Sequence, residues 1–232
     1  MLSDLLDTRK KLFDPWPDKY DEWFQTPIGA LVRRYESRML LDLLQPVQGE
    51  TILDIGCGTG IFTLDMLALG PRIVGLEISR PMLLRARPKV KGLPFDPLIG
   101  NMMFLPFADE VFDKTVSMTA LEFVADAHRA VREMFRVTQK GGTVVVTTLN
   151  SLSPWAVHRQ QKAQKGHQLF QKMIFRSPDE MLDLAPVDGV VKTAIHFQKE
   201  DDPDRAHEIE RQGRQNNLRT GAFLAARWVK PL

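Results

Sequence analysis

The sequence has 232 residues, of which 44% are hydrophobic and 26% are charged, and its net charge is +2. This length and composition suit one soluble α/β domain with a sizeable core, and the balanced charge does not indicate nucleic-acid binding. No apolar run approaches the ~18 residues of a membrane-spanning helix, and the acidic N-terminus is unlike a signal peptide. The single cysteine, Cys57, excludes an internal disulfide. We therefore expect a cytoplasmic protein without membrane insertion.

Aromatic residues and prolines crowd the first 27 residues, which are too broken for one regular helix. An aromatic arm of this kind could fasten itself to the body of the protein or form a lid over a pocket, and both roles stay open. Residues 28–45 then carry apolar side chains at three- and four-residue spacing, which predicts a helix. Thr26 and Pro27 supply its cap and its first turn.

Residues 51–60 begin as a short buried strand and continue with three glycines at every second position, Gly56, Gly58 and Gly60. The glycines permit a sharp turn and the close approach of a ligand to the backbone, and the apolar residues after them suit a helix. This order places a ligand at the carboxyl end of the strand. No Lys-Ser/Thr pair follows for a P-loop, and the third glycine is one position early for a dinucleotide loop. Asp54 would repel a pyrophosphate and better suits an ammonium group.

The second predicted strand, residues 72–77, ends in an acidic residue that suits a nucleoside. The carboxylate of Glu77 can accept two hydrogen bonds from the hydroxyls of a ribose. Ile78 could pack on a purine face, and Ser79 is a plausible cap for a helix that contains Met82. These features support a nucleoside ligand without choosing between a nicotinamide cofactor and another one.

Two further strand ends should complete the site. A weak third strand, residues 95–99, leads to Asn101 and Met102, and the fourth strand, residues 111–118, leads to Thr119 and Leu121. In doubly wound folds the fourth strand lies beside the first, so residues 118–122 should border a transferred group. The remaining predicted elements are a helix ending near residue 137, a turn at 139–142, strands at 143–149, 190–197 and 221–229, and a charged helix within 200–219.

Three segments together resemble the class I S-adenosylmethionine (SAM)-dependent methyltransferases. The pattern D-x-G-x-G-x-G at 54–60 resembles motif I of that family, and G-N-M-M-F-L-P-F at 100–107 resembles its G-D-x-x-x-L-P-F segment. The pattern A-x-R-E-M-x-R-V-x-x-x-G-G at 130–142 is similar to the branch with the quinone-biosynthesis and biotin-pathway methyltransferases. Asn101 stands where the family has an acid, and its amide oxygen can still accept a weaker, uncharged hydrogen bond.

The resemblance implies an α/β fold, a doubly wound, Rossmann-like, seven-stranded and mostly parallel sheet with helices on both faces and an antiparallel edge strand. It implies SAM as cofactor. The histidines and acids are scattered rather than set at metal-ligand spacing, so we expect no metal. The residues expected to bind the cofactor are Asp54, Gly56, Cys57, Gly58, Gly60, Glu77, Ile78, Met82, Asn101, Met102, Thr119 and Leu121. We expect one domain over residues 1–232, made of an arm and helix (1–45), a SAM-binding core (50–150), a variable substrate cover (150–185) and C-terminal strands (186–232).

The expected chemistry is in-line attack of an acceptor on the sulfonium methyl group, with the protein orienting the reactants and excluding water. The chain lacks the N/D-P-P-Y/F motif and the Pro-Cys nucleophile of base methyltransferases, which favours a small-molecule acceptor over a nucleic acid. Tyr20 and His158 are weak candidates for a catalytic residue. The alternatives are a SAM-binding protein without catalysis that serves as a partner or regulator and, less favoured, a nicotinamide-dependent oxidoreductase. The acceptor and the oligomeric state are left unspecified by the sequence.

Overall fold

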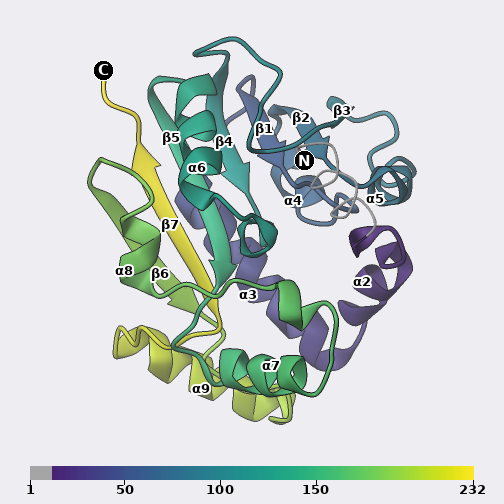
Figure 1. Cartoon of the computed structure of the whole chain (residues 1–232), viewed down its shortest axis with the longest axis vertical. Helices are drawn as coiled ribbons and strands as arrows, with labels where there is room; N and C mark the ends of the chain where they lie inside the picture. Colours follow the sequence, from purple (N-terminus) through teal and green to yellow (C-terminus); the bar gives the residue numbers. More distant parts are fainter. Residues whose placement is uncertain (1–11) are drawn as a thin grey trace.

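A seven-stranded sheet forms the centre of the computed structural model, which describes residues 12–232 (Figure 1). Its strand order is β3-β2-β1-β4-β5-β7-β6. The strands are β1 (Thr51–Ile55), β2 (Arg72–Glu77), β3 (Phe95–Ile99), β4 (Phe112–Ser117), β5 (Thr138–Leu149), β6 (Gly189–Ala194) and β7 (Phe223–Val229). The first five strands pair in parallel, whereas β7 is antiparallel to both β5 and the edge strand β6. The predicted seven-stranded, mostly parallel fold with antiparallel pairing at one edge is confirmed.

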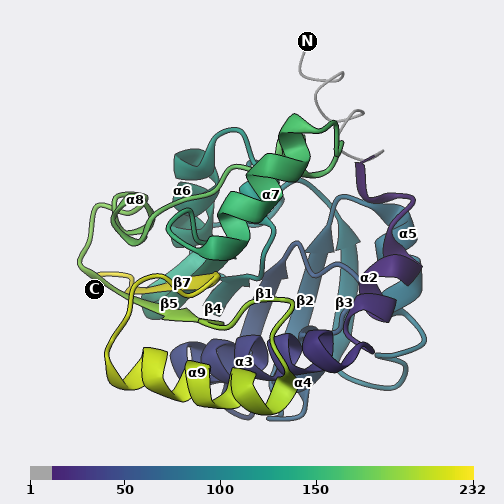
Figure 2. The ribbon, with the colours of Figure 1, turned by 90° about the horizontal axis from the view of Figure 1, so that it is seen from below.

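Helices cover both faces of the sheet. They are α2 (Pro17–Trp23), α3 (Pro27–Leu44), α4 (Thr63–Leu67), α5 (Arg80–Ala86), α6 (Ala127–Val137), α7 (Pro154–Gln164), α8 (Pro178–Leu182) and α9 (Pro203–Gln215), with 3-10 turns η1 (Leu121–Phe123) and η2 (Phe170–Lys172). Figure 2 shows α3, α4 and α9 along one face, and α6 and α8 on the other. Helices α2 and α7 lie beyond the carboxyl ends of the parallel strands (Figure 1).

Two hydrophobic cores follow from the alternation of side chains along the strands. In β1, Ile52 packs with the α3 and α4 layer, and Leu53 packs with the α6 layer. In β5, Val145 belongs to the first core while its neighbours Val144 and Val146 belong to the second. Because both faces are covered, these strands are apolar at nearly every position, which explains why the sequence marked them so clearly.

The predicted helix caps are present, but some strand boundaries differ from those predicted. Thr26 Oγ1 accepts from Gly29 N at 3.1 Å, and Ser79 Oγ accepts from Met82 N at 3.4 Å. Strand β5 begins at Thr138, without the separate turn predicted at 139–142, and the β4–β5 register shifts there instead. Strand β6 ends at Ala194 because Ile195 adopts a φ of 66°, which breaks an extended strand. The first part of the predicted aromatic arm, residues 1–11, lies outside the described residues.

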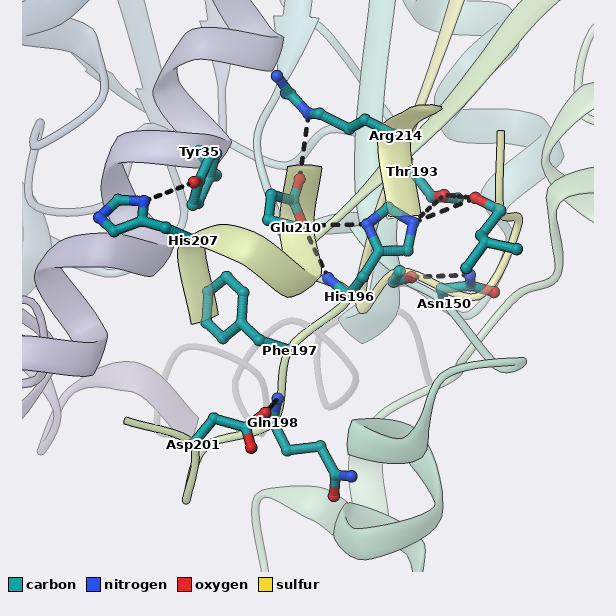
Figure 3. A network of polar contacts seen from close by, with 12 residues as sticks. Tyr35, Asn150, Thr193, His196, Phe197, Gln198, Asp201, His207, Glu210 and Arg214 are labelled. Atoms are coloured by element: carbon teal, nitrogen blue, oxygen red, sulfur yellow. Dashed lines mark hydrogen bonds and ion pairs between the residues drawn. The ribbon is translucent and has the colours of Figure 1, made fainter. Parts of the chain in front are cut away.

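Helix α9 is attached to the sheet edge by a buried polar network (Figure 3). Glu210 Oε2 accepts from the backbone N of His196 at 2.8 Å and lies 3.0 Å from its Nδ1, and Arg214 Nε donates to Glu210 Oε1 at 3.1 Å. Tyr35 of α3 is joined to His207 of α9 by a 2.8 Å hydrogen bond. The network therefore fixes α9 against both β6 and α3.

Within residues 12–232, no helix has both the length and the apolar character needed to cross a lipid bilayer.

Candidate cofactor and acceptor cavity

One cavity of about 530 Å³ opens where four parallel strands end. Its wall includes Gly56 and Gly58 after β1, Glu77 at the end of β2, Asn101 after β3 and Thr119 after β4. Open α/β sheets bind ligands at this edge. The wall also includes Ile78, Met82 and Met102, so eight of the twelve residues predicted to bind the cofactor line one cavity.

The glycine loop leaves room for a ligand at one position and needs glycine for packing at the two others. A Cβ on Gly56 would come within 2.5 Å of Ala120 Cβ, and one on Gly60 within 3.2 Å of Ala86 Cβ. At Gly58 the nearest atom lies 4.0 Å away, so the space beside it is open. All three glycines have positive φ angles, which L-residues with side chains adopt at a cost. The loop thus presents bare backbone to the cavity at Gly58.

Glu77 connects the end of β2 to the glycine loop. Its Oε1 accepts from the backbone N of Ile78 and of Ser79, both at 2.8 Å, and its Oε2 accepts from Gly58 N at 3.0 Å. Burial raises the pKa of the Glu77 carboxyl, and the three backbone hydrogen bonds act against this rise. Oε2 makes only one of these bonds, so it can accept a further hydrogen bond from a ligand hydroxyl.

Four residues predicted to touch the cofactor lie behind the cavity wall. Asp54 is buried beneath the loop, where its Oδ2 accepts from Thr63 Oγ1 at 2.6 Å and its Oδ1 has no partner among the described residues. Burial raises the Asp54 pKa to about 7. The Cys57 side chain is buried toward β2, and Leu121 packs in the core against α6. Gly60 packs on α5, so direct contact of these four with a cofactor stays a prediction.

The end of β4 is held in a strained conformation that faces the cavity. Thr119 has a φ of 44°, which is unusual for a β-branched residue and costs roughly 1–3 kcal/mol. Its backbone N donates to Thr147 Oγ1 at 2.9 Å, and Thr147 Oγ1 donates to Met118 Sδ at 3.2 Å. Two strands thus stabilise the strained residue where a transferred group was expected.

Asn101 uses its side chain to shape the loop after β3. Its Oδ1 accepts from Met103 N at 2.9 Å, which closes a local turn. A carbonyl oxygen has two lone pairs, so this oxygen can still accept from a second donor. The predicted contact with an exocyclic amine is therefore compatible with the geometry.

The aromatic arm both packs on the body of the protein and lines the cavity. Tyr20 and Phe24 pack edge to face with ring centroids 5.2 Å apart, and Phe24 continues the contact to Phe62 at 5.6 Å. Tyr20 and Trp23 also form part of the cavity wall. The described part of the arm therefore fastens to the body of the protein and borders the cavity, and its role as a lid stays a prediction.

An aspartate that the sequence did not single out anchors α2. Asp21 is 6% exposed, and its Oδ1 accepts from Thr59 Oγ1 at 2.7 Å. Its Oδ2 lies 2.6 Å from Lys89 Nζ and 3.0 Å from Arg85 Nε. These contacts lower the Asp21 pKa against the opposing effect of burial. Helix α2 is therefore tied to the glycine loop and to α5.

The cavity wall also holds charged residues: Glu36 and Arg159, which the sequence did not single out, and Glu122, which lies in the segment 118–122 predicted to border a transferred group. Glu36 of α3, Glu122 of η1 and Arg159 of α7 line the cavity together with Tyr20. Burial raises the pKa of Glu36 to about 8 and that of Glu122 to about 7. Burial also raises the pKa of the Tyr20 phenol, and the Glu36 charge adds to this rise, so the phenol stays protonated at neutral pH.

One signal could have identified Glu36. It lies four residues after Val32 and three before Met39, so a charged residue occupies the apolar stripe of α3. The second catalytic candidate, His158, lines the cavity but is exposed on α7. Residues 12–232 contain no group of three or more His, Cys, Asp or Glu side chains arranged to hold a metal ion.

Comparisons with known proteins point to one family. Residues 53–146 match the family described as "Methyltransferase domain". The malonyl-[acyl-carrier protein] O-methyltransferase of Yersinia pestis is 33% identical over 121 residues, which cover 52% of this chain and 45% of that protein. The demethylmenaquinone methyltransferase of Symbiobacterium thermophilum is 33% identical over 144 residues, which cover 59% of this chain and 57% of that protein. The chain thus spans about half the length of the curated relatives it matches.

A solved structure extends the likeness in fold to almost the whole chain. A SAM-dependent methyltransferase of Thermotoga maritima, described as a possible histamine N-methyltransferase, aligns with a TM-score of 0.68 and 24% identity. The alignment covers 95% of this chain and 98% of that one. The chain thus shares the fold of that methyltransferase over almost its whole length. Residues 53–146 are thus similar to a methyltransferase domain, and the chain is similar to malonyl-[acyl-carrier protein] O-methyltransferases and demethylmenaquinone methyltransferases over about half of its length.

Proposed function

We propose that the chain transfers the methyl group of SAM to a small-molecule acceptor by in-line displacement. The observation that supports this most is the continuity of the cavity, which joins a nucleoside-suited half at Gly58 and Glu77 to an aromatic half at Tyr20 and Trp155. Thr119 lines the same cavity. A methyl donor and an acceptor could therefore meet in one enclosure, which is the arrangement that positional catalysis needs.

The residues of the first half fit SAM. Gly58 offers open space and backbone, Glu77 has capacity to accept from a ribose hydroxyl, and Ile78 and Met82 supply apolar wall. When bound, the cofactor supplies an activated methyl group whose leaving thioether is neutral. The chain's own residues orient the reactants and exclude water, with the protonated Tyr20 phenol available as a hydrogen-bond donor. We further propose that residues 1–45 and 150–185 form the arm and cover over a core of residues 50–150 within one domain.

Calorimetric titration with SAM and with S-adenosylhomocysteine (SAH) tests the cofactor half. In Glu77→Gln, an amide NH₂ replaces one carboxylate oxygen and faces a backbone N–H, so we expect both affinities to fall about tenfold or more. Glu208→Gln is the matched control, because Glu208 is exposed on α9 and pairs only on that helix. Equal binding by wild type and Glu77→Gln would contradict the assigned cofactor site.

Methyl transfer itself is tested by incubating the protein with methyl-labelled SAM and a small-molecule panel. Labelled product that forms only when the wild-type protein is present would show that the chain is an enzyme and not merely a SAM-binding partner or regulator. SAM binding without transfer to any acceptor would favour that alternative. The nicotinamide alternative is tested by titration with NADH, for which we expect no binding.

A further inference from the structure

Two buried glutamate side chains form part of the cavity wall. Glu36 of α3 is 6% exposed, Glu122 of η1 is 1% exposed, and both line the cavity. No hydrogen bond from residues 12–232 acts on the Glu36 carboxyl group, and Glu122 Oε2 accepts a long one, 3.3 Å, from Thr148 Oγ1. Buried carboxyl groups are seldom left with so few partners. We call Glu36 and Glu122 the carboxyl pair, and it retains the capacity to bind a ligand.

Arg159 of α7 acts on both members of the carboxyl pair without contacting either. Its guanidinium lies over the Trp155 ring, 5.1 Å from the centroid, and its buried Nη1 has no hydrogen-bond partner among residues 12–232. Burial lowers the Arg159 pKa, the charges of Glu36 and Glu122 partly offset this, and no hydrogen bond to either glutamate contributes. Arg159 therefore compensates at most one carboxylate charge and leaves both carboxyl groups free to pair.

When both members of the carboxyl pair are ionised, one negative charge is left without compensation. Arg176 also acts on Glu122, but it acts on Glu180 as well and does not line the cavity. Three carboxylates, counting Glu180, thus face the two guanidinium groups of Arg159 and Arg176. Water screens the exposed charged residues of the wall, which are Lys19, Lys162, Lys199 and Glu200. The buried part of the cavity is therefore one positive charge short.

Protons can make up for this deficit. Burial raises the pKa of Glu36 to about 8 and that of Glu122 to about 7, so Glu36 is mostly protonated at pH 7. A cationic ligand can take the place of that proton. Because the Glu36 pKa lies only about one unit above neutral pH, releasing the proton at pH 7 lowers the affinity for such a ligand only about tenfold.

The rest of the wall suits an organic cation better than a metal ion. Residues 12–232 contain no group of three His, Cys, Asp or Glu side chains that could hold a metal, whereas the aromatic rings of Tyr20, Trp23 and Trp155 share the cavity wall with the carboxyl pair. Besides burial, both carboxyl charges and the Thr119 side chain affect the pKa of the Tyr20 phenol, so the pair lies near the strand end where a transferred group was expected. Ring faces attract organic cations, and an ammonium group can donate to two carboxylates and a phenol oxygen at once.

We propose that Glu36 and Glu122 are specificity-determining residues that bind the methyl acceptor as an organic amine in its protonated form. This proposal rests on the proposed function, because it assigns the acceptor half of the same cavity. For methyl transfer, the bound ammonium gives one proton to a carboxylate of the pair, which frees the nitrogen lone pair. The nitrogen then attacks the methyl group of SAM, the C–N bond forms as the C–S bond breaks, and SAH leaves as a neutral thioether.

The first test uses the full chain saturated with SAH and four compounds that share one carbon skeleton. Binding of 2-phenylethylamine, 2-phenylethanol, phenylacetate and ethylbenzene is measured at pH 7 by ligand-observed NMR titration. We expect the amine to bind about tenfold or more tightly than the alcohol and the hydrocarbon, because only the amine supplies the missing positive charge. Phenylacetate should bind most weakly.

Two variants connect this preference to the carboxyl pair. Glu36→Gln and Glu122→Gln should each weaken 2-phenylethylamine binding about tenfold while leaving 2-phenylethanol and SAH binding within about twofold. A glutamine has the shape of a protonated glutamic acid, so the wall itself is preserved. Glu208→Gln is the matched control, because Glu208 is exposed on α9 and pairs only on that helix.

Proton release gives a readout that a purely structural role would not change. Calorimetry of the SAH complex at pH 7, in two buffers that differ in ionisation heat and contain no primary amine, counts the protons released on binding. We expect about one proton per molecule of 2-phenylethylamine in the wild type and clearly less in Glu36→Gln. Binding of 2-phenylethanol should release none.

Several outcomes would overturn the proposal. These are equal binding of the amine and the alcohol, preference for phenylacetate, no binding of any compound to the SAH complex, unchanged preference in both variants, or amine binding without proton release. Failure of SAH itself to bind would instead count against the proposed function, so the two failures are distinguishable.

Discussion

Replacing Glu210 with alanine should destabilise the protein more than any other single change at the sheet edge. The Glu210 side chain is 1% exposed and contacts His196 twice and Arg214 once. Breaking a buried ion pair by removing one partner typically costs about 3–5 kcal/mol, since it leaves the other charge without compensation. Arg214 is 31% exposed and can be solvated by water, so we expect the lower part of that range, about 3 kcal/mol.

The assay is urea denaturation at several pH values. Burial lowers the pKa of His196, but its hydrogen bonds to Glu210 and to Leu218 O outweigh burial, and the net shift is upward. A raised pKa in the folded state gives stability that is fully present below the unfolded value of about 6.5 and is lost as the pH rises through the folded value. The loss caused by Glu210→Ala should therefore be larger near pH 6 than at alkaline pH.

The matched control is Glu208→Ala, which removes an exposed carboxylate from the same helix and should cost far less stability, because water solvates that carboxylate and its partner. The reasoning is refuted if the two variants lose similar stability, or if the loss in Glu210→Ala grows with pH.

Three further predictions concern the cavity. Gly56→Ala should weaken SAH binding about tenfold or more, because the added Cβ would meet Ala120. Gly49→Ala is the control: Gly49 has a φ of +88° and open space beside it, so the added Cβ should cost only about 1–2 kcal/mol of backbone strain. Titration and denaturation of both variants separate the steric clash from the backbone strain. Asp21→Ala should cost about 2–3 kcal/mol and accelerate limited proteolysis of the arm, and a wild-type cleavage rate would contradict the anchoring role. Burial raises the pKa of Glu36 to about 8, so the folded state holds its proton and wild-type stability should fall between about pH 4.5 and pH 8. Glu36→Gln should remove up to about 5 kcal/mol of that fall, and parallel pH profiles of the two proteins would contradict the assignment.

The cofactor half of the cavity could be predicted because its determinants are local in sequence. Gly56 and Gly58 follow directly from a buried strand, and Glu77 ends the next one. The carboxyl ends of neighbouring parallel strands lie at one edge of the sheet, regardless of the side chains elsewhere in the chain. The sequence predicted less well which loop residues face the ligand. Cys57 and Leu121 differ from the neighbouring residues only in the direction in which their side chains point. That direction depends on the packing of β2 and α6, which local sequence does not encode.

The acceptor half could be predicted only in part. The strand order placed residues 118–122 beside a transferred group, but nothing local joins residues 36 and 159 to that segment. Each of residues 36, 122 and 159 has an ordinary interpretation by itself: a charge on a helix, an acid after a strand, and a base on a variable cover. Only the fold brings α3, η1 and α7 to one cavity and shows that Arg159 Nη1 is buried there without a partner. An apolar replacement at such a position would be expected to stabilise the isolated protein. Arg159 is nevertheless held there with its guanidinium over the Trp155 ring, 5.1 Å from the ring centroid, so the variable cover contributes both a charge and an aromatic ring to the cavity wall.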